Sequence, residues 1–292
     1  MYPEGIADAA ARFQETGLQG SHYACPGCGP VTAMRMILDV LGPNSIVFVP
    51  PGCGAIYISP GHATVTIPAL NCVYASVFGQ AAGYAYADRM LGGDRQVLVW
   101  GGDGAFFDIG LEGLSFVANQ NYDIIALCND NQGYQNTGHH STTGTPRQSR
   151  TRSTPGGKPE QQKELMEILV AHRIPYAATI SAAFPEDLKA KVARAASTRG
   201  FAFLHLLAPC INWGYEGPLG IKLARLSVLC RLHPLYEVVE GSYRLTLNPP
   251  ARPVQEYTLL QRRFEGADAQ LLQEETDARW RRLMTRCEEA AP

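Results

Sequence analysis

Short apolar runs alternate with longer amphipathic stretches through most of the chain, from about residue 30 to residue 230. The apolar runs have the length of buried strands and cover residues 45–50, 96–102, 123–130, 176–181 and 201–209. The stretches with helical apolar spacing lie at residues 30–41, 78–91, 109–120, 159–172 and 185–197. Strands that alternate with helices of this size predict an α/β fold, in which helices cover both faces of a mostly parallel sheet.

Two regions break this alternation. Residues 131–158 form a polar segment with almost no apolar residues, and a loop of this length inside a compact domain is usually functional or disordered. Further on, the pattern predicts a hairpin over residues 234–246 and a charged helix from about 266 to 288. We therefore expect one α/β domain over residues 1–232, and a C-terminal extension over residues 233–292 that packs on this domain or on a partner subunit.

Charge and composition exclude several classes of protein. The 292 residues include 25 lysines and arginines against 27 aspartates and glutamates, and a formal net charge of -2 argues against a nucleic-acid-binding protein. No run of 18 apolar residues predicts a membrane span, and residues 1–17 lack the pattern of an export signal. We expect a cytoplasmic protein. Because disulfides are rare in that compartment, the eight cysteines need another role.

Three of the cysteines lie in glycine-rich turns. Cys25 and Cys28 form a Cys-x-x-Cys pair in HYACPGCGP, and Cys53 follows in VPPGCGA. Glycine lets the backbone wrap closely around a bulky group, and both iron–sulfur clusters and structural zinc usually take four ligands. The best candidate for the fourth is Cys210, at the carboxyl end of a predicted strand. The Cys-x-x-Cys pair alone fits zinc or a redox dithiol about as well as a cluster, although the wide spacing of the other two cysteines weakens a compact zinc site.

Oxygen ligands follow two neighbouring predicted strands. One strand ends at Gly102 and is followed by Asp103, and the next apolar run ends just before Asn131. Because parallel strands deliver their carboxyl ends to one crevice, we expect Asp103 and Asn131 to meet there. With the backbone carbonyl of Gly133 they suit Mg²⁺, whose octahedral shell a diphosphate and water would complete. A Gly-Asp-Gly turn alone is a weak signal, since an aspartate that caps a helix explains it equally well.

Taken together, these motifs resemble a known family. Gly-Asp-Gly followed 28 positions after the aspartate by an asparagine is the pattern of thiamine diphosphate enzymes. The CPGCG turn, a cysteine 25 positions beyond it and a late cysteine resemble the β subunit of 2-oxoacid:ferredoxin oxidoreductases. The resemblance is strongest to the pyruvate:ferredoxin oxidoreductase (pyruvate synthase) branch and runs from about residue 20 to residue 250. Its motifs include PPGCGA, WGGDGAFFDIG, DNQGYQNTG and HPLYEVVEGSYRLT.

The resemblance implies the cofactors and their ligands. One [4Fe-4S] cluster would be held by Cys25, Cys28, Cys53 and Cys210. Mg²⁺ would be held by Asp103, Asn131 and the Gly133 carbonyl, and would anchor thiamine diphosphate. Asn136 would act as a catalytic residue beside the reactive carbon of the thiamine. The further residues expected to contact the cofactor are Gly102, Gly104, Ala105, Tyr134, Thr137 and Gly54, with Cys53 beside them.

The resemblance also implies the reaction and the partners. The expected reaction is the oxidative decarboxylation of a 2-oxoacid, with pyruvate favoured, to acyl-CoA and CO₂, with coenzyme A as co-substrate and electrons leaving through the cluster. In this family a separate α subunit supplies the glutamate that activates thiamine, and Glu112 of this chain is better explained as a structural residue. We expect a hetero-oligomer with this α subunit, together with γ and ferredoxin-like δ subunits or an external ferredoxin.

Several alternatives stay open. The same chemistry could act on an aryl 2-oxoacid such as phenylglyoxylate, or on oxalate. A cluster-free thiamine lyase or synthase would leave the four cysteines unexplained, and a zinc- or cluster-binding scaffold would leave Asp103 and Asn131 unexplained. His139 and His140 could contact substrate or could be solvated. The Arg147–Arg152 loop could meet a coenzyme A phosphate or a partner subunit, or could equally be a solvated, mobile loop.

Overall fold

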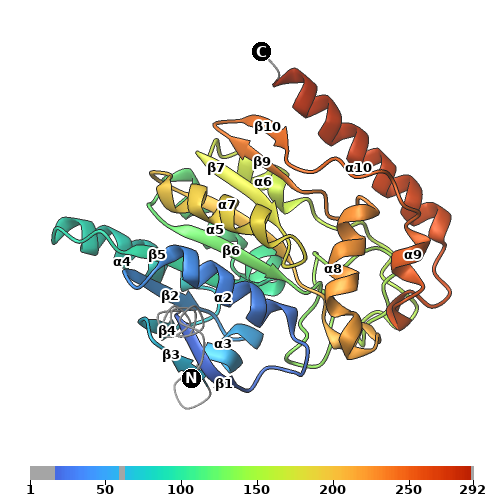
Figure 1. Ribbon diagram of the computed structural model, residues 1–292, viewed down its shortest axis with the longest axis horizontal. Helices are drawn as coiled ribbons and strands as arrows, with labels where there is room; N and C mark the ends of the chain where they lie inside the picture. The colour runs from blue at the N-terminus through green and yellow to red at the C-terminus, as the bar shows by residue number, and fades with distance from the viewer. Residues whose placement is uncertain (1–16, 59–62, 291–292) are drawn as a thin grey trace, which may run out of the picture.

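The computed structural model describes residues 17–58 and 63–290 (Figure 1). The N-terminal segment that we expect to carry no export signal lies almost wholly outside these residues. One sheet of eight strands forms the centre of the molecule, and its order is β10-β9-β7-β8-β6-β5-β2-β4. The strands are β2 (Ser45–Val49), β4 (Ala69–Asn71), β5 (Gln96–Gly102), β6 (Ile125–Asp130), β7 (Tyr176–Ile180), β8 (Ala202–Leu207), β9 (Tyr236–Val239) and β10 (Ser242–Leu245).

The six strands from β7 to β4 in this order are parallel, and the β9–β10 hairpin adds two antiparallel strands at one edge. The expected α/β fold with a mostly parallel sheet is therefore confirmed. The central strands are apolar along their whole length because helices cover both of their faces. Along β5, for example, Val97 and Val99 pack on one face, whereas Leu98 and Trp100 pack on the other.

Two helical layers enclose the sheet. The first layer comprises α2 (Gly29–Leu41), α3 (Cys53–Ile58) and α7 (Pro185–Ser197). The second comprises α4 (Val77–Met90), α5 (Leu111–Asn119), α6 (Leu165–Val170) and the long α10 (Ala269–Glu289), whose Trp280 and Leu283 join the same core. Each helix buries one apolar stripe, and the burial of these stripes provides the main driving force for folding.

A third apolar cluster lies beyond the carboxyl end of β8, where it forms the wall of the candidate site. It is built from α8 (Gly220–Leu229), α9 (Gln255–Thr258) and the short turns η2 (Ile211–Trp213), η3 (Gly217–Leu219) and η4 (Arg262–Phe264). In Figure 1, α8 and α9 lie together to the right of the sheet. A separate two-stranded sheet pairs β1 (Leu18–His22) with β3 (Ala63–Val65).

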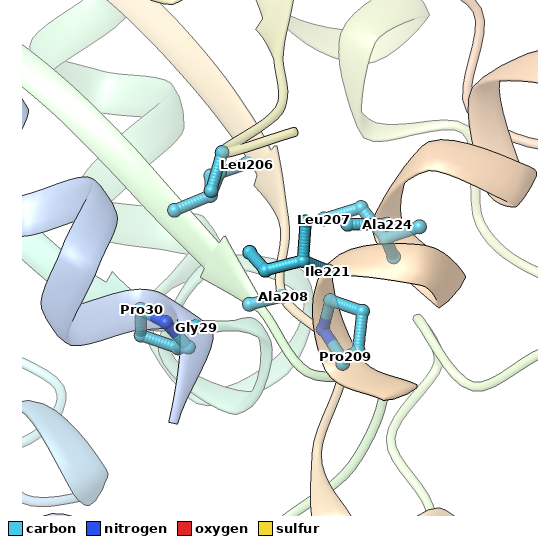
Figure 2. A pocket seen from close by; sticks show the side chains of 10 residues that line it. Gly29, Pro30, Leu206, Leu207, Ala208, Pro209, Ile221 and Ala224 are labelled. Atoms are coloured by element: carbon cyan, nitrogen blue, oxygen red, sulfur yellow. The ribbon is translucent and has the colours of Figure 1, made fainter. Parts of the chain in front are cut away.

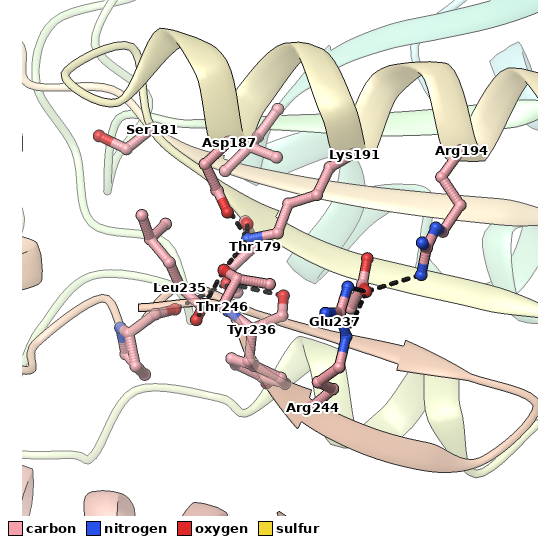
Figure 3. A network of polar contacts seen from close by, with 12 residues as sticks. Thr179, Ser181, Asp187, Lys191, Arg194, Leu235, Tyr236, Glu237, Arg244 and Thr246 are labelled. Atoms are coloured by element: carbon pink, nitrogen blue, oxygen red, sulfur yellow. Dashed lines mark hydrogen bonds and ion pairs between the residues drawn. The ribbon is translucent and has the colours of Figure 1, made fainter. Parts of the chain in front are cut away.

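Buried charges fasten the hairpin to the main domain (Figure 3). Lys191 of α7 is 2% exposed, and its Nζ donates hydrogen bonds to the Thr179 carbonyl, Asp187 Oδ2 and Thr246 Oγ1 at 2.7 to 2.9 Å. Every hydrogen of the ammonium group is thereby used, which compensates its desolvation. Residues 236–245, predicted to belong to a C-terminal extension, therefore continue the main sheet.

Glu237 of β9 forms the second half of this network. It accepts hydrogen bonds from Arg194, Arg244 and Tyr176. Burial alone would raise the pKa of Glu237, but these hydrogen bonds outweigh it and hold the pKa below its ordinary value. The carboxylate is therefore charged at neutral pH and ties α7 to both strands of the hairpin.

The expected strands and helices are found with small shifts of their ends, and two differences matter. The predicted helix over residues 159–172 forms only as α6, because Lys163 N donates to the Thr143 carbonyl and Lys158 Nζ donates to the carbonyls of residues 160 and 161. In addition, a π-helical turn, η1 (Gly104–Ile109), precedes α5. Within the described residues, no helix is long and apolar enough to cross a membrane.

Candidate cofactor site

The parallel register of β5 and β6 brings Asp103 and Asn131 to the same edge of the sheet. Gly102 at the end of β5 pairs with Asn129 of β6, so the segments that follow these two strands leave the sheet side by side. Asp103 follows β5 directly, and Asn131 follows β6 directly. The crevice outside the carboxyl ends of parallel strands is the usual ligand site of such sheets.

Three oxygen-bearing groups converge at this edge. One outer atom of the Asn131 carboxamide lies 3.1 Å from Asp103 Oδ1 and 2.8 Å from the Gly133 carbonyl oxygen. A half-turn of the amide exchanges its nitrogen and oxygen at this position. With the nitrogen there, the amide donates a hydrogen bond to each neighbouring oxygen. With the oxygen there, three acceptors face one another, an arrangement that a cation stabilises.

Asp103 is a buried carboxyl group that accepts a hydrogen bond from the long polar loop. It is 1% exposed, and Thr142 Oγ1 donates a hydrogen bond to its Oδ2 at 2.5 Å. Thr145 supports Thr142 and donates to the Gln132 carbonyl at 2.8 Å. Burial raises the pKa of Asp103 well above its ordinary value, and the negative charge of Asp130 adds to this effect. Burial therefore favours the protonated form of Asp103, and ionisation of this group would be eased by a cation.

A second buried carboxyl group, Asp130, lies beneath the site. Its Oδ1 accepts a hydrogen bond from the Gln132 amide, and its Oδ2 lies 2.9 Å from His205 Nε2. Burial raises the pKa of Asp130 and lowers the pKa of His205 to about 4, so the imidazole is neutral at pH 7. The contact is thus a hydrogen bond to a neutral histidine, so His205 adds no positive charge to the site.

The two glycines beside Asp103 differ in their surroundings. A Cβ added at Gly104 would lie 2.1 Å from the Tyr134 ring and 2.7 Å from the Tyr74 hydroxyl, so only glycine fits there. A Cβ at Gly102 would meet nothing within 4 Å, which leaves that stretch of backbone accessible to a ligand. Ala105 is fully buried in η1. The Tyr134 hydroxyl donates to Asp108 at 3.2 Å, and this bond ties the loop to η1.

Asn136 and Thr137 are exposed at the tip of the same loop. A backbone bridge between Tyr134 and His140 closes the tip. Gly133 stands at the base, where an added Cβ would lie 2.8 Å from both the Gln135 side chain and the His140 carbonyl. The loop therefore presents two polar side chains to solvent next to the buried oxygen group.

The four predicted cysteine ligands lie on segments that converge on the same region. Cys25 is exposed in the turn before α2, Cys28 is the N-cap of α2, Cys53 begins α3 and Cys210 precedes η2. In Figure 2, Gly29 and Pro30 at the start of α2 face Ala208 and Pro209 after β8 across a small apolar pocket. Because Cys28 precedes Gly29 and Cys210 follows Pro209, this packing carries the two cysteines toward each other.

The electrostatics of the thiols show that they form one group. Burial raises the pKa of Cys28 to about 12, and the charges of Cys53, Cys210 and Cys25 add to the effect. Burial likewise raises the pKa of Cys53 to about 11 and that of Cys210 to about 12. All four cysteines are free. Within residues 17–58 and 63–290, no three cysteine, histidine or acidic side chains come close enough to share a single metal ion.

The cysteine group and the oxygen group are adjacent. When the Asn131 amide oxygen faces Asp103, the amide nitrogen lies 4.0 Å from Cys53 Sγ. Gly54 packs against Trp100 so tightly that an added Cβ would lie 3.0 Å from its ring. On the other side, Trp213 Nε1 donates to the Asn131 carbonyl at 2.9 Å, while its backbone amide donates to the Cys210 carbonyl at 2.9 Å. One tryptophan therefore joins a cysteine of the first group to an asparagine of the second.

The polar loop is packed more firmly than its composition indicates. His139 is half-buried and its Nδ1 lies 2.6 Å from Gln135 Oε1, whereas His140 is exposed. Arg147 forms an ion pair with Glu275 of α10 at 2.8 Å, and the Arg150 amide donates to the Arg263 carbonyl at 2.8 Å. These contacts fix the loop against the C-terminal elements.

Sequence reasoning did not identify three residues of this site. Thr142 could have been suspected, because it lies in the polar loop that follows Asn131. Trp213 could have been suspected from its place three residues after Cys210. Arg263 had no signal, because it belongs to a C-terminal segment whose pattern indicates only packing.

Comparisons with known proteins identify the relatives of this chain. Residues 61–206 match the family model described as thiamine pyrophosphate enzyme, C-terminal TPP binding domain. The chain is 35% identical over 260 residues to the pyruvate synthase subunit PorB of Methanothermobacter marburgensis, covering 86% of this chain and 90% of that protein. It is 34% identical over 290 residues to the ketoisovalerate oxidoreductase subunit VorB of Pyrococcus horikoshii, covering 93% of each.

A solved structure shares the fold. The 2-oxoglutarate:ferredoxin oxidoreductase from Magnetococcus marinus superposes with a TM-score of 0.60 at 18% identity. The superposition covers 73% of this chain and 80% of that chain. At this identity, the likeness concerns the fold.

The buried carboxyl groups predict how stability depends on pH. Because the pKa of Asp103 is raised in the folded chain, its contribution to stability is fully present below the ordinary carboxyl pKa and is lost as pH rises through the raised value. We expect the melting temperature of the metal-free protein in EDTA to fall as pH rises from 5 to 8.5. The Asp103→Asn variant should lose much of this slope. An unchanged slope in Asp103→Asn would show that Asp103 is not a strained buried acid.

Proposed function

This chain belongs to the β subunits of the 2-oxoacid:ferredoxin oxidoreductase family, and we propose that it binds thiamine diphosphate through Mg²⁺ and holds one [4Fe-4S] cluster beside it. Together with an α subunit, in the cytoplasm, it would convert a 2-oxoacid and coenzyme A to acyl-CoA and CO₂, releasing two electrons and a proton. The single observation that carries the proposal is the adjacency of a three-oxygen group and a four-cysteine group on one sheet edge.

The spacing of the oxygen group supports Mg²⁺. Neighbouring ligands of an octahedral Mg²⁺ ion, each about 2.1 Å from the metal, lie about 3 Å apart. The Asn131 amide atom lies 2.8 and 3.1 Å from the other two oxygens, which fits that geometry once the amide oxygen faces them. A cation there would also relieve the burial of Asp103, and Thr142 would hold the aspartate in position. Gly102 leaves room for a diphosphate to complete the shell.

The cysteine group supports a cluster over a single zinc ion. Tetrahedral zinc with Zn–S bonds of about 2.3 Å needs its sulfur ligands about 4 Å apart. The four cysteines influence one another electrostatically, yet among the described residues no three metal-binding side chains come close enough to share one ion. A cluster spreads its four thiolate ligands over several iron atoms, so it does not require three side chains to share one ion. The raised pKa values of Cys28, Cys53 and Cys210 are consistent with thiols that ionise only when they bind iron.

The cofactors and the residues of the chain would have separate roles in the reaction. Thiamine diphosphate, when bound, supplies the electron sink that lets a 2-oxoacid lose CO₂, and an adjacent iron–sulfur cluster accepts electrons singly. The chain itself orients the diphosphate through Asp103, Asn131 and Gly133. Asn136 is exposed at the loop tip and can hydrogen-bond a substrate oxygen. Tyr134 and Thr137 belong to the same loop and would contact the cofactor.

The chain also depends on partners. Glu112 lies exposed in the first turn of α5, and we assign the glutamate that activates thiamine to the α subunit. Electrons would then pass to γ and δ subunits or to an external ferredoxin. Arg147 is engaged with Glu275, so among the loop arginines the exposed Arg152 is the better placed to meet coenzyme A or a partner.

We favour pyruvate as the substrate. The near-equal identity to pyruvate synthase and ketoisovalerate oxidoreductase subunits, 35% and 34%, adds branched 2-oxoacids to the candidates. Phenylglyoxylate and oxalate remain further alternatives.

Loss of the Asp103 charge should weaken cofactor binding. We expect Asp103→Asn to bind thiamine diphosphate in the presence of Mg²⁺ at least tenfold more weakly, a loss of about 1.4 kcal/mol or more. Calorimetric titration with thiamine diphosphate, first in Mg²⁺ buffer and then in buffer with EDTA, provides the measurement. Asp39→Asn, a matched change on the exposed surface of α2, should bind like the wild type. Equal affinity of both variants would contradict the metal site.

Loss of one cysteine ligand should empty the cluster site. The wild-type chain, purified without oxygen, should contain about four iron and four sulfide per chain, as one [4Fe-4S] cluster requires. Cys53→Ser and Cys210→Ser should lose most of the iron and the visible absorption, whereas Cys287→Ser on α10 should retain both. Zinc without sulfide in the wild type, or full iron in both ligand variants, would contradict the cluster.

A further inference from the structure

Arg263 is a buried cation without a carboxylate partner. It is 3% exposed, and among the residues that the structure describes it forms no ion pair. Its guanidinium carbon lies 3.6 Å from the centre of the Trp213 ring, and its Nη2 donates to Gln132 Oε1 at 2.8 Å. Its Nε donates to Gln261 Oε1 at 2.9 Å. Burying a guanidinium among neutral groups is costly unless an anion balances it.

Part of the hydrogen-bonding capacity of this arginine is unused. Arg263 Nη1 is buried and has no hydrogen-bond partner among residues 17–58 and 63–290. Within the same residues, the buried hydroxyl group of Tyr215, a residue 9% exposed, also has no partner. Buried donors without partners are rare in native proteins. Such a donor usually has a specific role, such as binding an ion, a water molecule or a redox group. Two such donors here flank Trp213, since the Tyr215 ring centre lies 6.4 Å from that of Trp213.

Both donors lie beside the cysteine turns. Trp213, on which Arg263 stacks, is hydrogen-bonded through its backbone amide to the Cys210 carbonyl. Tyr215 faces the other cysteine turn, because a Cβ added at Gly220 would lie 3.4 Å from the Tyr215 hydroxyl and 3.6 Å from the Gly27 carbonyl. Gly27 separates Cys25 from Cys28. Arg263 therefore lies near the segment of Cys210, and Tyr215 lies near the turn of Cys25 and Cys28.

The pattern of charges points the same way. Burial lowers the pKa of Arg263 to about 10, and the negative groups around it, which include Asp130 and Cys210, oppose the shift. The arginine therefore stays charged at pH 7. Asp130 has both carboxyl oxygens engaged, one by the Gln132 amide and one by His205. The thiol group becomes a further anion beside this arginine only when it binds a cluster as thiolates.

We infer that Arg263 is the counter-ion of the iron–sulfur cluster and that, with the Tyr215 hydroxyl as a second donor, it sets the reduction potential of the cluster. The inference rests on the proposed function, because it presumes that the cluster is bound. A [4Fe-4S] cluster with four thiolates carries two negative charges when oxidised and three when reduced. A fixed positive charge stabilises the reduced form more, so it raises the potential at which the cluster accepts an electron.

The test is a redox titration of the full-length chain, purified without oxygen and monitored by EPR of the reduced cluster. Iron and sulfide are counted first in every sample. At the potential where the wild type is half reduced, Arg263→Gln should lower the ratio of reduced to oxidised cluster at least tenfold. For a one-electron couple this corresponds to a shift of about 59 mV to more negative potential. Arg263→Lys, which keeps the charge, should recover most of the shift.

Two further variants keep the test decisive. Arg262→Gln removes the neighbouring exposed charge, which solvent screens, and should change the ratio less than twofold. Tyr215→Phe removes one oxygen atom and should shift the potential in the same direction as Arg263→Gln but less, which provides a second arm if Arg263→Gln fails to fold. If Arg263→Gln and Tyr215→Phe keep their iron and have the same midpoint reduction potential as Arg262→Gln, the inference is overturned. The proposed function is not affected by that result. A wild-type chain without iron would instead overturn the proposed function.

Discussion

The hydrogen bond from the Trp213 indole to the Asn131 carbonyl is the contact on which the arrangement of the site depends. The Trp213 backbone amide also donates a hydrogen bond to the Cys210 carbonyl, so a single residue links a cysteine of one group to an asparagine of the other. The bond is fully buried and is supported by the stacked Arg263. Because electron transfer between two cofactors depends on their separation, this link would hold the proposed cluster at a fixed distance from the proposed thiamine site.

The site concentrates acidic groups in a buried volume, where their ionised forms are costly. Asp103, Asp130 and three of the four thiols all have raised pKa values, and burial is the main cause for each. Arg263 is a buried cation that acts on two of these groups, Asp130 and Cys210. Such an arrangement is unfavourable on its own. Cations supplied by cofactors would neutralise it, so in this account the cofactors belong to the folding energetics as well as to the chemistry.

The sequence predicts the sheet and the residues that its strands deliver, because both depend on local patterns. Asp103 and Asn131 directly follow β5 and β6, and parallel pairing brings them together whatever the rest of the chain does. Thr142 and Trp213 reach the site through loops whose path no local pattern specifies. Arg263 lies 132 positions after Asn131, and only tertiary packing brings it there. The prediction of a helix over residues 159–172 was wrong in its first half. The backbone amides of the buried Lys158 and of Lys163 donate hydrogen bonds to the polar loop instead.

The most direct test of the account uses the native complex, purified without oxygen with its partner subunits. Pyruvate, 2-oxoisovalerate, phenylglyoxylate and oxalate are added in turn, with and without coenzyme A, and reduction of the iron–sulfur clusters is followed by EPR and visible absorption. The account predicts that at least one 2-oxoacid, pyruvate first, reduces the clusters and forms the corresponding acyl-CoA. It also predicts that no 2-oxoacid reduces the cluster of the isolated chain. Failure of every 2-oxoacid to reduce the clusters of the intact complex would contradict the account.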